Sequence, residues 1–160
     1  MSEHPSDGAP DGVPQDLWLA AQRAQANAYV PYSRFPVGAA VRAPSGTIYA
    51  GANVENASFG LTRCAEQSAV QALVTAGQRA PADDASGKTD PEKRHRQQVR
   101  RRFSGGAVGQ GEERAGRGRF GACGQVLFEF APQARVYLVN TAGVLRETTV
   151  AELLPAGFRL

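Results

Sequence analysis

Residues 50–66, AGANVENASFGLTRCAE, constrain the chain more than any other stretch. They run from an extended segment through the polar loop NVEN to Cys64 and Glu66, which stand where an apolar-periodic helix begins. A strand that leads through a loop into a helix is typical of layered α/β domains. The segment therefore predicts one helix packed on a sheet, with two reactive side chains at its first turn.

Cys64 and Glu66 combine a potential metal ligand with a potential proton carrier. The simpler interpretation is structural, because a Cys-x-Glu triplet is common by chance and a cysteine at a helix start is usually a small buried residue. At the N-cap, however, unpaired backbone N–H groups and the helix dipole stabilise a thiolate and lower the thiol pKa. The position therefore favours the form of cysteine that binds metal.

Hydrophobic periodicity and turn residues predict the remaining elements in alternation. In the first half we expect a disordered tail over 1–14, a helix over 15–29, a hairpin of strands 37–43 and 47–54, and a helix over 64–76 that Gly77 ends. In the second half we expect a helix over 121–131, strands over 134–140 and 144–148, and a short helix opened by a Thr149/Glu152 capping box. Strands that alternate with helices indicate an α/β layered domain.

Residues 78–119 differ from the rest of the chain. Between Lys93 and Arg119 lie nine of the 18 Lys and Arg residues against two acidic residues, so the basic charge of the protein is local. Gly- and Arg-rich sequence of this kind is usually a surface loop, although Phe103, Ala107 and Val108 hint at a weak strand. The alternative, a nucleic-acid patch, is disfavoured because aromatic residues for base stacking are nearly absent.

Composition narrows the class of protein. The length fits one domain with a sizeable core, and no apolar run is long enough to span a bilayer. A basic region followed by an apolar one is absent from the N-terminal residues, so we expect no secretory signal and a cytoplasmic location. Two widely separated cysteines, Cys64 and Cys123, then indicate free thiols or metal ligands rather than a disulfide.

Four segments in order, AYVPYSRFPVGAAV, GANVENASFGLTRCAE, GACGQVLFEF and TVAELLPAGF, resemble the small, homotetrameric, zinc-dependent cytidine deaminases. The resemblance covers most of 16–77 and 121–158. It implies a three-layer α/β/α sheet with helices on both faces for residues 15–160. It also implies a homotetramer that deaminates cytidine and deoxycytidine to uridine and deoxyuridine in pyrimidine salvage.

The resemblance assigns a role to each site residue. Cys64 and Cys123 are implied to bind zinc, which activates water, and Glu66 to shuttle the proton without being a ligand. The implied substrate-binding residues are Phe35 and the backbone of Ala65 for the base, Asn53 and Glu55 for the ribose, and Phe158 from a neighbouring subunit. The ribose-binding pair indicates a free nucleoside rather than a polynucleotide, and it does not discriminate at the 2′ position. Since no apolar run could span a bilayer, we expect no membrane partner.

The second half of the metal motif departs from the family pattern. Phe120 stands where a third zinc cysteine is expected, Gly124 replaces an arginine, and Gln67 stands where many members have an arginine. Because catalytic zinc normally has three protein ligands, we expect impaired activity. Sequence error, or degeneration in a lineage no longer selected for activity, would each produce this pattern.

Two alternatives stay open beside an active deaminase. One is a catalytically inert homologue that keeps the fold and binds nucleosides. In the other, a rescuing third ligand such as His95 or Glu112 completes the metal site, although nothing in the sequence fixes the geometry of either residue.

Overall fold

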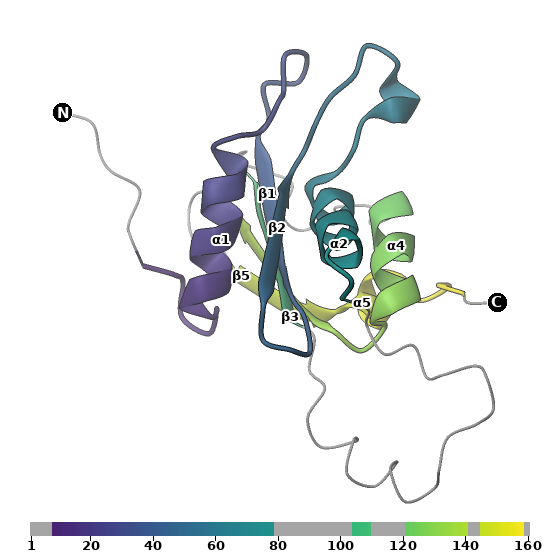
Figure 1. The fold of residues 1–160 in the computed structure, drawn as a ribbon. Helices are drawn as coiled ribbons and strands as arrows, with labels where there is room; N and C mark the ends of the chain where they lie inside the picture. Colours follow the sequence, from purple (N-terminus) through teal and green to yellow (C-terminus); the bar gives the residue numbers. More distant parts are fainter. Residues whose placement is uncertain (1–7, 79–103, 110–120, 141–144, 159–160) are drawn as a thin grey trace, which may run out of the picture.

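The computed structural model of the protein describes residues 8–78, 104–109, 121–140 and 145–158. Five strands form one sheet in the order β2-β1-β3-β4-β5. Figure 1 shows α1 on one face of this sheet and α2 and α4 on the other. The elements are α1 (Gln15–Gln25), β1 (Val37–Arg42), β2 (Ile48–Ala52), η1 (Phe59–Leu61), α2 (Ala65–Thr75), β3 (Ser104–Gly109), α4 (Ala122–Phe130), β4 (Arg135–Asn140), β5 (Leu145–Thr149) and α5 (Val150–Leu153).

The predicted three-layer α/β/α arrangement is confirmed by the side chains of β1. Ala40 packs on the α1 side, in a buried cluster with Leu17 and Trp18. Its neighbours Ala39 and Val41 point to the other face and pack against α2. Both faces of β1 are therefore buried, which is why this strand reads as an almost continuous apolar run.

The connections follow from local sequence. The predicted hairpin is present, because β1 and β2 pair antiparallel and the N–H of Ala43 donates to the carbonyl of Thr47 across the turn. β3 and β4 run parallel, whereas β5 returns antiparallel to β4. Gly77 ends α2 with a φ of 77°, a left-handed conformation that favours glycine. Thr149 and Glu152 form the expected capping box at the start of α5.

Two sequence predictions are corrected by the fold. The tail predicted over 1–14 is too long, because Val13 is buried in the cluster around Leu17 and Trp18. The interpretation of 78–119 as a surface loop is wrong for Ser104–Gly109, which form β3 in the middle of the sheet. Glycines and an alanine let this strand lie between two others while giving it a weak apolar signal. The rest of 78–119, apart from Gln78 itself, lies outside the described residues.

Glycines set how closely the helices approach the sheet. A Cβ atom on Gly38 would collide with the backbone of α1 at Ala21, and one on Gly51 would collide with the backbone of α2 at Ala69. The two helices therefore cross the hairpin at backbone distance from opposite sides. Among the described residues, no helix is long and apolar enough to cross a membrane.

We predict that Gly51→Ala destabilises the fold, because the added methyl group forces α2 away from β2. The free energy of unfolding should fall by about 1–3 kcal/mol, the usual cost of overpacking. Urea unfolding followed by the fluorescence of the single Trp measures this change. Gly60→Ala is the matched control, because a Cβ there meets nothing within 4 Å and the expected change stays within about 0.5 kcal/mol. Equal stability of the two variants would contradict the close approach.

Candidate functional site

The starts of α2 and α4 bring three reactive side chains together. Cys64 is the N-cap of α2, Glu66 lies in the first turn of the same helix, and Cys123 lies in the first turn of α4. Their ligand atoms, two sulfurs and a carboxylate oxygen, all lie within 4.8 Å of one another. All three residues are partly buried. Residues 59 positions apart in sequence thus form one cluster.

Local hydrogen bonds fix Cys64 at the helix end. Its N–H donates to Oε1 of Gln67 over 3.2 Å, and its carbonyl accepts from Oγ of Ser68, also over 3.2 Å. Cap bonds of this kind pin the first turn of a helix. Gln67, which replaces the arginine of many family members, therefore holds the backbone of Cys64.

Burial and contacts within the cluster shift the pKa values of its three side chains. A hydrogen bond with Cys123 lowers the pKa of the Cys64 thiol to about 7, although partial burial and the charge of Glu66 oppose the change. The same bond, with burial, raises the pKa of Cys123. Burial also raises the pKa of Glu66. The sequence predicted the direction of the Cys64 shift, but its main cause is the second thiol rather than the helix end.

These donors suit a zinc ion. Thiolate sulfur is a soft ligand that zinc prefers, and a tetrahedral site places neighbouring ligand atoms roughly 3.3–3.8 Å apart, given bond lengths of about 2.0–2.3 Å. The spacing within the cluster is compatible with such a centre. Phe120, at the position of the third family ligand, and the alternative ligands His95 and Glu112 lie outside the described residues.

Asn53 and Glu55, the predicted ribose contacts, both hold the backbone of the segment after α1. Oδ1 of Asn53 accepts from the N–H of Val37 over 2.8 Å, and its Nδ2 donates to the carbonyl of Phe35 over 2.9 Å. Oε2 of Glu55 accepts from the N–H groups of Tyr32 and Ser33 over 2.9 and 3.1 Å. The hydrogen bonds from Ser33 and Tyr32 lower the pKa of Glu55, so this carboxylate stays ionised.

The remaining predicted contacts occupy different surroundings. Phe35 is exposed, as is Phe158 near the end of the chain, whereas Ala65 is buried at the start of α2. Gln125 of α4 holds the backbone of Phe158 through its amide, which donates over 2.8 Å to the Phe158 carbonyl. Sequence reasoning gave no role to Gln125 or to Ser33. The serine in PYSRF is a turn signal that would have indicated a side-chain-to-backbone bond.

We predict that Cys64 is the more reactive thiol in protein stripped of metal with a chelator. Because its pKa is near 7, alkylation by iodoacetamide should be fast above pH 7 and fall off below it, while Cys123 reacts slowly. Peptide mass spectrometry across a pH series measures both rates. Cys123→Ala removes the hydrogen-bond donor and should return the Cys64 pKa to about 8.5.

Ser68→Ala is the matched control, because this hydroxyl contacts the carbonyl of Cys64 and not its sulfur. Its alkylation profile should equal that of the wild type. An unchanged Cys64 profile in Cys123→Ala would contradict the proposed cause of the shift.

Comparisons with known proteins agree with this geometry. Residues 13–88 match the family profile of the cytidine and deoxycytidylate deaminase zinc-binding region. The chain is 38% identical to the cytidine deaminase of Sporosarcina psychrophila, with 90% of each chain covered.

Two solved structures are similar in fold. The crystal structure of cytidine deaminase from Burkholderia pseudomallei has a TM-score of 0.72 at 34% identity, covering 91% of this chain and 99% of that one. That of the Mycobacterium tuberculosis cytidine deaminase has a TM-score of 0.60 at 32% identity, covering 91% and 96%. With a thiol–carboxylate cluster at the starts of two adjacent helices, the chain belongs to the cytidine deaminase family, whose members are hydrolytic enzymes.

Proposed function

We propose that this protein hydrolyses cytidine and deoxycytidine to uridine and deoxyuridine, releasing ammonia. The observation that carries the proposal is the cluster of Cys64, Glu66 and Cys123 in a chain of this family. The two thiols would hold zinc, which when bound supplies a nucleophile by lowering the pKa of a water to about 7. Such chemistry fits a role in cytoplasmic pyrimidine salvage.

Glu66 is proposed as the proton carrier. Deamination moves protons from the attacking water to the ring nitrogen and to the leaving amino group. A carboxyl whose pKa is raised by burial takes up and gives back a proton near neutral pH more readily than an ordinary glutamate. Its place in the first turn of α2, two residues after Cys64, supports this role, because a water held by a metal on the two thiols would lie close to it.

Substrate recognition is proposed to come from the segments beside this cluster. Phe35 and the backbone of Ala65 would contact the base, and Asn53 and Glu55 would accept from and donate to the sugar hydroxyls. An ionised Glu55 suits a hydroxyl donor. These contacts favour a free nucleoside over a polynucleotide, and none of them distinguishes a ribose from a deoxyribose at the 2′ position.

Phe120 supports a second candidate function. Phenylalanine cannot bind zinc, so two thiols would remain where a catalytic site normally has three protein ligands. A weakly held metal would reduce turnover without affecting the hydrophobic clusters on the two faces of the sheet. The alternative is therefore an inert homologue that binds nucleosides.

The decisive experiment measures zinc per chain and uridine formation on protein purified without added metal. Glu66→Gln should lower kcat by about 10²–10⁴-fold while zinc content stays unchanged, because only the proton carrier is lost. Phe120→Cys should raise both zinc content and kcat by restoring a third thiolate. Ser45→Cys, which adds a thiol on the exposed β1–β2 turn, is the matched control and should change neither.

Three outcomes are distinct. Turnover in the wild type that is lost in Glu66→Gln supports the enzyme. Turnover only in Phe120→Cys supports the inert homologue. Absence of zinc and of turnover in Phe120→Cys contradicts both the proposed ligand set and the proposed activity.

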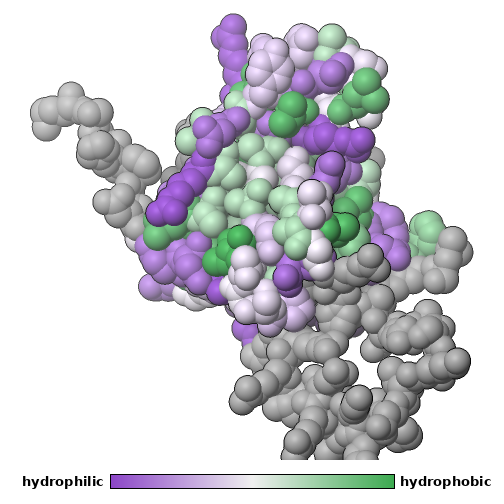
Figure 2. Space-filling view, in the orientation of Figure 1, coloured by the Kyte–Doolittle hydropathy of each residue, from purple (hydrophilic) through white to green (hydrophobic). Residues whose placement is uncertain are grey.

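Assembly into a homotetramer is the last part of the proposal. Large apolar side chains are exposed on two neighbouring loops and on the C-terminal tail. They are Tyr29, Tyr32, Phe35, Val54, Phe59, Leu61 and Phe158. Hydrophobic residues of the two loops are visible at the top of Figure 2. Exposed apolar surface of this kind often marks a protein interface, and burial between subunits would bring Phe158 to a neighbouring site.

We predict that the wild type sediments at four times the 16.9 kDa mass of one chain. Phe59→Ser, which changes a side chain that is 78% exposed, should shift the distribution toward smaller species, because it removes apolar contact area. Val74→Ser is the control, since this exposed residue lies on α2 away from the loops. Sedimentation velocity measures all three proteins, and a wild type that sediments as one chain would contradict the proposal.

A further inference from the structure

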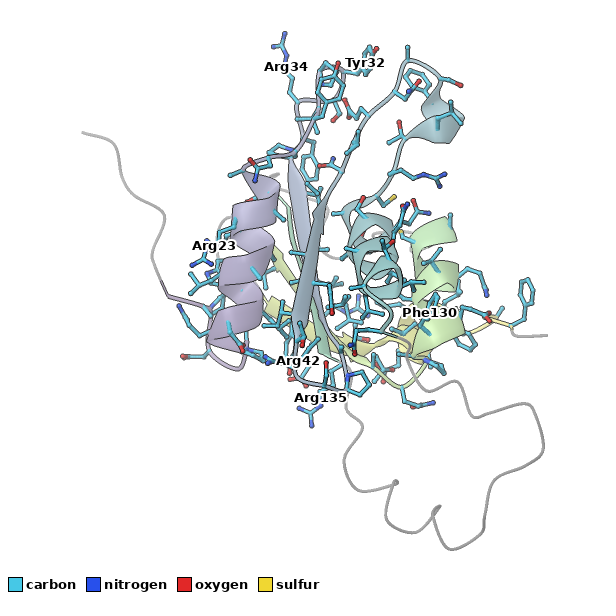
Figure 3. All side chains as sticks on the ribbon, in the orientation of Figure 1. Arg23, Tyr32, Arg34, Arg42, Phe130 and Arg135 are labelled. Carbon is cyan, nitrogen blue, oxygen red and sulfur yellow. The ribbon has the colours of Figure 1, made fainter. Side chains whose placement is uncertain are left out.

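The segment between α1 and β1 is held in place although it is exposed. Figure 3 shows Tyr32 and Arg34 at its tip, away from the sheet. Each backbone N–H from Tyr32 to Phe35 nevertheless has a partner: Glu55 for Tyr32 and Ser33, the Val30 carbonyl for Arg34, and Oγ of Ser33 for Phe35. Four consecutive bonded amides describe a built turn rather than a loose connection.

Ser33 contacts this turn through both its backbone N–H and its hydroxyl. Its N–H donates to the Glu55 carboxylate over 3.1 Å, and its hydroxyl accepts from the N–H of Phe35 over 3.0 Å. It therefore lies between the residue proposed to contact the sugar and the residue proposed to contact the base. Asn53 holds the end of the turn that leads into β1, because its Nδ2 donates to the carbonyl of Phe35.

The two oxygens of Glu55 divide these contacts unequally. Oε2 accepts both shorter bonds, at 2.9 and 3.1 Å. Oε1 accepts a longer bond from the Ser33 N–H, at 3.3 Å. A carboxylate oxygen has room for two good donors, so Oε1 can accept a sugar hydroxyl while Oε2 keeps its hold on the turn.

We propose that Ser33 is a positioning residue that fixes Phe35 relative to Glu55, so that sugar and base are recognised as one unit. This inference rests on the proposed function for the identity of the ligand, but the turn itself exists in the free protein. Arg34, with a φ of 55°, adopts a left-handed conformation that a non-glycine residue rarely adopts. The neighbouring bonds of Ser33 compensate for this unfavourable geometry. The ring of Tyr32 meets that of Phe59 edge-on at 6.4 Å, which ties the turn to the opposite loop.

The first test examines the turn in free protein by amide hydrogen exchange. Ser33→Ala removes the acceptor for the Phe35 N–H and the hydroxyl contact with Glu55, but leaves the Ser33 N–H on Glu55. Exchange at Phe35 should therefore rise by about three- to tenfold, the usual effect of one hydrogen bond, while exchange at Tyr32 changes little. Ser33→Thr restores the hydroxyl and should restore protection. Ser45→Ala, which loses a hydroxyl bond to Thr47 in another exposed turn, should leave Phe35 unchanged.

The second test asks whether Ser33 acts through Phe35. Ser33→Ala should raise KM for cytidine by about three- to tenfold with kcat nearly unchanged, and Ser33→Thr should rescue it. In a Phe35→Ala background the same change should have a smaller effect, because the aromatic ring that Ser33 positions is gone and only the hydroxyl contact with Glu55 is left to lose. Independent, multiplying effects would overturn the inference.

The two proposals fail in different ways. If the wild type does not turn over cytidine, the proposed activity fails. The effects of the Ser33 and Phe35 variants are then measured on the Kd for uridine by calorimetry instead of on KM. If Phe35 exchange is the same in Ser33→Ala and the wild type, or if Ser33→Thr does not restore protection, the role of Ser33 is refuted whatever the activity. Faster exchange at Phe35, together with an effect of Ser33→Ala on binding that is smaller without the Phe35 ring, supports it.

Discussion

The close approach of two helices to one Gly- and Ala-rich hairpin is the constraint on which the rest of the structure depends. α1 and α2 meet β1 and β2 at backbone distance because Gly38 and Gly51 carry no side chain. This packing fixes the start of α2 relative to the sheet, and α4 packs beside α2 on the same face. The distance between the thiols of Cys64 and Cys123 is thus a consequence of helix packing, set by residues that take no part in chemistry.

Several polar side chains around the cluster hydrogen-bond to the backbone. Asn53, Glu55, Gln67 and Gln125 each hydrogen-bond to a main-chain group of a segment that surrounds the cluster. Binding groups arranged in this way are rigid before a ligand arrives, which lowers the entropy cost of recognition. It also means that removing such a side chain changes the shape of the site together with its chemistry.

Much of the fold could be predicted from sequence because hydrophobic period and turn residues agree in most elements. Leu17, Ala21 and Gly77 each lie where their pattern predicts, and Cys64 is the N-cap as expected. β3 was only hinted at, because its glycines give little apolar signal and basic residues flank it in sequence. Local patterns also missed Val13, which is buried in a cluster that includes Ala40 of β1 and Tyr137 of β4, residues distant in sequence.

The candidate site was predictable to a similar degree. Resemblance named Cys64, Glu66 and Cys123, and the structure brings them together. The interaction between the thiols, which dominates the pKa of Cys64, depends on the distance between two helices and has no sequence signal. The same is true of the bonds from Glu55 to the turn, because backbone donors look alike in every sequence.

The division of the cluster between two helices has a consequence for how such an enzyme changes over generations. One half, on α2, holds Cys64 and Glu66 and departs from the family pattern at Gln67, while the other half departs from it at Phe120 and at Gly124 of α4. Cys64, Glu66 and Cys123 are not members of the hydrophobic clusters, so substituting them removes reactive groups without removing contacts of those clusters. One nucleotide separates the codons of phenylalanine and cysteine. A chain carrying Phe120 is therefore a single mutational step from a third thiol at this position.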